Sequence, residues 1–90
     1  MAISRAERRR DRHDRFVAEF GPKRAGAALD LLELLEYGWH DCYGEITPPD
    51  DVIDDILLLS RGDLAQLISA AHLALSDWRD TRVAADALRG

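Results

Sequence analysis

Apolar residues recur at intervals of three and four along most of this chain, and they nowhere alternate with polar residues over the length of a strand. The clearest stretch lies between residues 28 and 42, where the apolar positions share one face of a helix. These positions are Ala28, Leu31, Leu32, Leu35, Trp39 and Cys42. The periodicity predicts an all-α fold.

Capping signals divide the chain into separate helices. Ser4 with Glu7 three residues later forms a capping box, and Gly21 is a typical helix end. Thr47 is the predicted N-cap of the third helix and Asp63 that of the fourth. The predicted helices span residues of about 5–20, 22–43, 48–60 and 63–88. Amphipathic helices with short loops predict a small, irregular antiparallel bundle of four helices.

Length and composition favour one domain that folds by packing alone. The chain has 90 residues, of which 47% are apolar. Its single cysteine, Cys42, excludes an intramolecular disulfide, which is typical of cytoplasmic domains. Residues 56–59 form the longest strictly aliphatic run, so we expect no membrane span. The preference for arginine over lysine favours a GC-rich bacterial source.

Charge is distributed unevenly along the chain. Residues 1–24 carry eight basic and four acidic side chains (+4), whereas residues 25–90 carry four and thirteen (−9). The first half of the first helix offers no apolar face, so residues 1 to about 12 are predicted to form a partly solvated basic arm that is dispensable for folding. The basic side chains grouped with this arm are Arg5, Arg8, Arg9, Arg10, Arg12 and, just beyond it, Arg15.

The arm allows a second interpretation, in which its arginines bind phosphate groups of a nucleic acid. The acidic residues Glu7, Asp11 and Asp14 are interleaved with the arginines and reduce the local charge. No aromatic residue lies among them to stack on a base. A nucleic-acid-associated accessory protein therefore stays as the alternative hypothesis.

An acidic block lies in the third predicted helix. Its members are Asp50, Asp51, Asp54 and Asp55. Helical spacing stacks like charges four residues apart, which destabilises an isolated helix by about 0.2–0.5 kcal/mol per pair. The block is interpreted in three ways: an ordinary solvated face, an internal partner for the arginines of the first helix, or a surface for a basic partner.

The densest group of reactive side chains surrounds residues 39–45. Glu36 and His40 are four residues apart and share a helix face, so a small metal-dependent enzyme is the outlying hypothesis. Neighbouring positions point about 100° apart on a helix, and the pattern is not repeated on a second helix. We therefore expect no metal, no cofactor and no catalytic site.

Core and surface assignments complete the sequence-based expectations. Trp39 and Trp78 are predicted core anchors, Ile68 is assigned to the core, and Leu29 is assigned to a polar face. Apolar residues that fall off the core face of the fourth helix predict a homodimer surface. They are Ala70, Leu73, Ala84 and Leu88. The function expected from the sequence is that of a non-enzymatic interaction or regulatory protein with an unknown protein partner.

Overall fold

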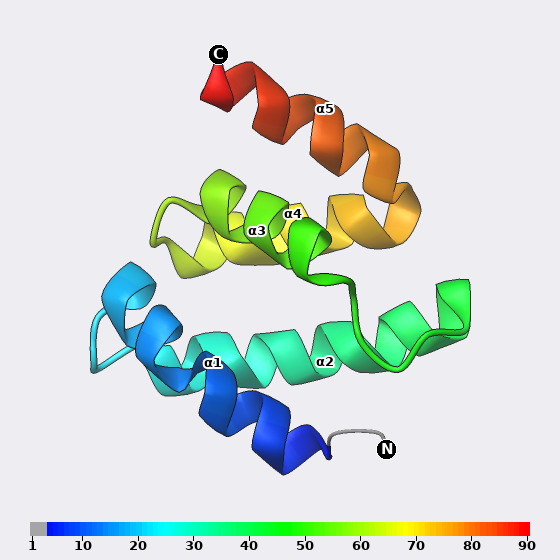
Figure 1. The fold of residues 1–90 in the computed structure, drawn as a ribbon. Coiled ribbons are helices and arrows are strands. Elements are labelled where there is room, and N and C mark those ends of the chain that lie inside the picture. The colour runs from blue at the N-terminus through cyan, green and yellow to red at the C-terminus, as the bar shows by residue number, and fades with distance from the viewer. Residues whose placement is uncertain (1–3) are drawn as a thin grey trace.

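The computed structural model describes residues 4–90, and this part of the chain forms five helices and no strand (Figure 1). The helices are α1 (Arg5–Phe20), α2 (Ala25–Tyr43), α3 (Asp50–Ser60), α4 (Leu64–Ser76) and α5 (Trp78–Arg89). The predicted all-α class is confirmed. None of these helices is both long and apolar enough to cross a membrane.

Helix α1 begins and ends at the predicted residues. The Glu7 backbone N–H donates to the Ser4 hydroxyl, and that hydroxyl donates to the Glu7 carboxylate in return. Gly21 ends the helix with a φ of 84°, a left-handed conformation that favours glycine. Only the last turns contribute to the core, through Phe16 and Phe20.

Helix α2 is the longest helix and supplies most of the core. It begins at Ala25, about three residues later than predicted. Trp39 is buried, as predicted, whereas Cys42 is exposed rather than in the core. The assignment of Leu29 to a polar face is wrong, because this side chain is buried. Residue 29 lies on the side of α2 that α1 covers, and the sequence alone did not indicate this contact.

Helix α3 begins at Asp50, two residues later than predicted, because Pro49 rather than Thr47 is its N-cap. The Thr47 hydroxyl instead accepts a hydrogen bond from Arg12. The buried apolar side chains of α3 are Val52, Ile53, Ile56 and Leu57.

The predicted fourth helix, residues 63–88, consists of two helices. Asp77 has extended backbone angles, and its carboxylate accepts a hydrogen bond from the Arg79 backbone N–H, so it caps α5 as a new helix. Helix α5 turns back against α3 and α4. The change of direction moves Trp78 off the α4 seam and leaves it 38% exposed, so its assignment as a core anchor is wrong.

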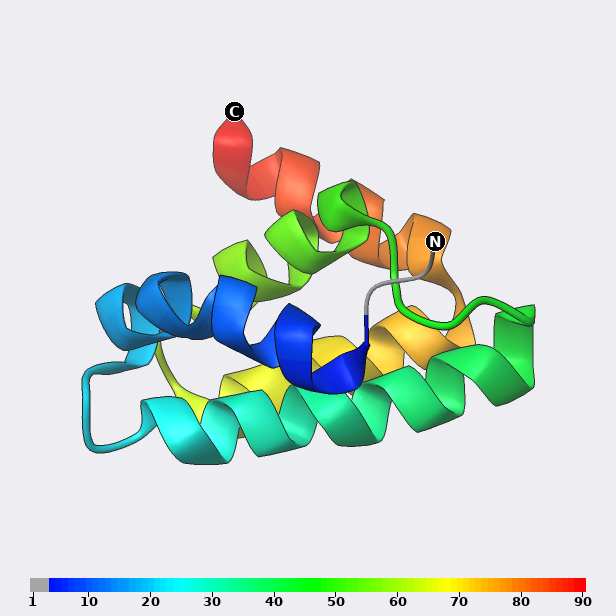
Figure 2. The same cartoon turned by 60° about the horizontal axis from the view of Figure 1, so that its bottom comes forward.

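The four-helix antiparallel arrangement is not what the structure shows. Helix α1 packs on α2, while α3, α4 and α5 pack on one another, and α4 joins the two groups by lying beside α2. Helices α2 and α4 run in the same direction (Figures 1 and 2). The Tyr43 hydroxyl at the end of α2 donates to the Ala74 carbonyl near the end of α4.

Candidate functional site

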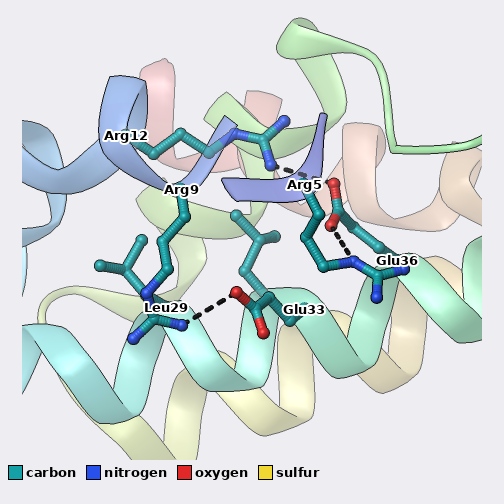
Figure 3. A pocket seen from close by; sticks show the side chains of 7 residues that line it. Arg5, Arg9, Arg12, Leu29, Glu33 and Glu36 are labelled. Carbon is teal, nitrogen blue, oxygen red and sulfur yellow. Dashed lines mark hydrogen bonds and ion pairs between the residues drawn. The ribbon is translucent and has the colours of Figure 1, made fainter. Parts of the chain in front are cut away.

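The arginines of α1 lie along an acidic row on α2, as Figure 3 shows for Arg5, Arg9 and Arg12. The row consists of Asp30, Glu33 and Glu36. Three arginines converge on Glu36: the nitrogens of Arg5, Arg8 and Arg12 lie 3.6, 2.7 and 3.2 Å from its carboxylate oxygens. Ionic contacts thus attach the half of α1 that has no buried apolar side chain.

Glu36 is the buried centre of these contacts, with 2% of its surface exposed. Burial opposes ionisation of its carboxyl, but hydrogen bonds from Arg8, Thr47 and Arg12 outweigh this effect and hold the pKa below its ordinary value. A buried carboxylate without such partners would be strongly destabilising. These contacts therefore stabilise the folded chain.

Arg9 and Arg15 also have carboxylate partners. An Arg9 nitrogen lies 2.7 Å from Asp30 and 3.0 Å from Glu33, and an Arg15 nitrogen lies 2.6 Å from Asp54. Five of the six arginines that the sequence suggested for phosphate binding thus contact acidic side chains of their own chain, and the sixth, Arg10, is exposed. Residues 1–3 of the predicted arm lie outside the residues that the structure describes.

The acidic block of α3 divides between two sides of the helix. Asp55 is 1% exposed, and its two oxygens accept from Arg82 at 2.6 Å and Arg89 at 2.7 Å, so it cannot belong to a partner surface. Asp51 accepts from Arg82 at 2.8 Å, and this hydrogen bond lowers the pKa of its carboxyl. Asp50 and Asp54 line a groove on the other side.

This groove lies between α1 and the start of α3 and has a volume of about 750 Å³. Phe16 and Ile53 are the buried apolar residues that line it, and Ile46 is an exposed apolar residue of the α2–α3 loop. Its charged lining residues are Arg8, Asp11, Arg12, Arg15, Asp50 and Asp54. This volume lies within the range of about 300–1,000 Å³ typical of ligand pockets.

A second candidate surface is the outer face of α2 and α4. Leu75 of α4 lies over Gly38 of α2, where a Cβ atom would be 2.9 Å from the Leu75 Cδ1 atom. Leu34 is one turn before Gly38, and Ile68 is two turns before Leu75, so helical spacing places both beside the same seam. Leu34 is 65% exposed and Ile68 is 54% exposed. The assignment of Ile68 to the core is therefore wrong.

The residues proposed from sequence as a dimer surface do not form one face. Ala70 is buried and cannot line an intermolecular contact. Leu73 and Ala84 are half-buried, and Leu88 is exposed on α5. The reason is the break at Asp77, because α5 turns back against α4 and covers part of this surface within one molecule.

The outlying metal-site hypothesis receives no geometric support. The Glu36 carboxylate is occupied by arginines, and the His40 side chain is 65% exposed. Among residues 4–90, no group of three or more His, Cys, Asp and Glu side chains is arranged to hold a metal ion.

Comparison with known proteins gives no relative for this chain. No family model, no curated protein and no solved structure matches it.

Sequence reasoning missed Asp30 and Glu33 as partners of α1, and Arg82 and Arg89 as partners of Asp55. A signal existed for the first group: residues 30, 33 and 36 follow one helix face, as residues 5, 8, 9 and 12 do. Two oppositely charged rows of this kind predict a docked pair of helices. No equivalent signal marked Arg82 and Arg89, because their approach to α3 depends on the break at Asp77.

Proposed function

We propose that this chain is a non-enzymatic interaction protein that works as a homodimer, with the outer face of α4 as its self-association surface. The observation that carries the proposal is the absence of charge on α4. Its thirteen residues include no Asp, Glu, Lys or Arg, in a chain of which 32% is charged. Depletion of charged residues is a compositional mark of the centre of protein interfaces.

The exposed side chains of α4 are suited to close packing against another helix. Ile68 supplies an apolar contact, and the other exposed positions are small or uncharged. They are Ala65, Gln66, Ser69, His72 and Ser76. Leu34 extends the apolar area onto α2. Small residues permit a short distance between two helix axes.

A second copy of the chain is the occupant that fits this surface best. In a twofold dimer, each residue near the axis meets its own equivalent. On a chain with a net charge of −5, a twofold contact between charged faces would bring like charges together. An uncharged face avoids this repulsion, so the protein can associate with itself there.

The decisive experiment compares two substitutions that add the same charge at different exposed apolar positions. Ile68→Glu places a carboxylate on the α4 face, and Val83→Glu places one on α5, where Val83 is 69% exposed. Sedimentation velocity should show a dimer for the Val83→Glu chain and a monomer for the Ile68→Glu chain, with both helical by circular dichroism. A dimer that survives Ile68→Glu would refute the proposed surface.

The nucleic-acid alternative has weaker support. Five of its six candidate arginines already bind carboxylates, and phosphate would have to displace these carboxylates. Arg10 is exposed on α1, but a single exposed arginine gives phosphate binding little support. We retain the interaction protein as the proposal.

A further inference from the structure

We infer that the groove between α1 and α3 binds a basic, apolar segment of a partner protein. This inference rests on the proposed function only in treating the chain as an interaction protein, and it does not depend on the α4 contact. It concerns a separate surface, formed by α1, the α2–α3 loop and the first turns of α3.

The floor of the groove is apolar and preformed. Phe16 is fully buried and Ile53 nearly so, which fixes both side chains in the core beneath the groove. Ile46 is 55% exposed at the groove wall, although an isoleucine is strongly stabilised by burial. An apolar side chain of a partner that entered the groove would cover Ile46.

Three arginines and three aspartates line the groove, but two of the arginines are largely covered. Arg8 and Arg12 line it, but both guanidinium groups donate to Glu36, and their side chains are only 12% and 16% exposed. Asp11 and Asp50 are exposed, and Asp50 lies one helical turn before Asp54. A segment with lysine or arginine beside its apolar residues would match these three carboxylates.

One ion pair already shows the contact that such a segment would make. Arg15 donates to Asp54 at 2.6 Å, and both side chains are about half exposed. Exposed pairs of this kind contribute little stability, about 0–1 kcal/mol, so they exchange readily with another cation. A basic side chain of the partner can replace Arg15 on Asp54 while its neighbours contact Asp11 and Asp50.

The test uses a short amidated peptide of alternating leucine and lysine, labelled with fluorescein, and a matched peptide with glutamate in place of lysine. Fluorescence polarisation with the full chain should show saturable binding of the Leu/Lys peptide and none of the Leu/Glu peptide. Binding of the Leu/Glu peptide alone would assign the groove to an acidic segment and would overturn the inference.

Two variants separate the groove from general attraction to an acidic protein. Asp50→Asn removes a groove carboxylate, whereas Asp51→Asn removes the same charge from the side of α3 that faces α5. Loss of one exposed ionic contact should weaken peptide binding by about two- to fivefold for Asp50→Asn. Asp51→Asn should leave it unchanged. Equal weakening by both variants would show non-specific attraction and would contradict the inference.

The apolar floor gives a second, independent readout. Ile46→Ser keeps the charge of the groove and removes its exposed apolar wall. The double variant Ile46→Ser/Asp50→Asn should bind the Leu/Lys peptide more weakly than Asp50→Asn alone. Ile68→Glu, which tests the α4 surface, should leave peptide binding intact, so failure of the dimer and failure of the groove are distinguishable.

Discussion

The Arg82 guanidinium donates from Nε to a carboxylate oxygen of Asp55 at 2.6 Å, and Asp55 is almost fully buried. Arg89 donates to the second oxygen of the same carboxylate at 2.7 Å. Both arginines come from α5, so a single buried side chain of α3 holds the C-terminal helix along its length. This contact stabilises the position of α5 after the break at Asp77.

Asp55→Asn should therefore destabilise the fold, since it removes the negative charge that two arginines share. Hydrogen bonds to charged groups contribute about 1.5–3 kcal/mol, and we expect a loss of about 2–3 kcal/mol in the free energy of unfolding. Urea denaturation measures this loss. Asp54→Asn is the matched control, because Asp54 is half exposed, and its loss should stay below about 1 kcal/mol.

The buried Glu36 predicts a specific acid sensitivity. Its pKa in the folded chain lies below the ordinary value of 4.5, so its stabilising contribution is complete above that pH. The contribution is lost as the pH falls through the lower pKa of the folded state. The free energy of unfolding of the wild-type chain should thus decline below about pH 4.5.

Glu36→Gln should reduce the free energy of unfolding at neutral pH by about 3–5 kcal/mol, because it leaves arginines beside a neutral group. It should also flatten the decline of the free energy of unfolding at acid pH. Glu33→Gln provides the control, since Glu33 is about one-third exposed and contacts Arg9 alone among the arginines of α1. A Glu36→Gln chain that shows the same acid dependence as the wild type would contradict the account.

Removal of residues 1–12 tests whether the arm is dispensable, as the sequence suggested. The contacts of the arm predict the opposite result, because the deletion removes Arg5, Arg8 and Arg12, which hold the first half of α1 to Glu36. The truncated chain should have a lower melting temperature by circular dichroism. An unchanged melting temperature on truncation would favour the sequence expectation.

The two tryptophans should respond differently to truncation. Trp39 is 2% exposed, and Trp39→Ala should reduce the free energy of unfolding by about 3–5 kcal/mol. Trp78 is 38% exposed, and Trp78→Ala should have a clearly smaller effect. Equilibrium denaturation of both variants measures the two losses in the free energy of unfolding. Similar losses would contradict the exposed position of Trp78.

Local signals made much of the fold predictable. Ser4, Gly21 and Asp63 mark helix ends through short-range hydrogen bonds and backbone conformation, and all three occur where the sequence placed them. The break at Asp77 was missed because the apolar period of α4 continues smoothly to Trp78. The sequence still held a hint, since Asp is a favoured N-cap residue and Asp80 places an acid in the first turn of the helix that follows Asp77.

The candidate surfaces were less predictable than the helices. Asp50 and Asp55 have the same residue type on one helix, yet Asp50 lines an open groove and Asp55 is buried under two arginines. Their different environments depend on how α1 and α5 dock, which is a tertiary property. Ile68 was assigned to the core for a related reason, since helical periodicity identifies a face but not its neighbours.

The molar mass of the wild-type chain in solution tests the central claim most directly. Light scattering over a dilution series should give a mass near twice 10.1 kDa at high concentration, with a fall toward a single chain on dilution. A mass near 10.1 kDa at every concentration would contradict self-association through α4 and, with it, the proposed homodimer.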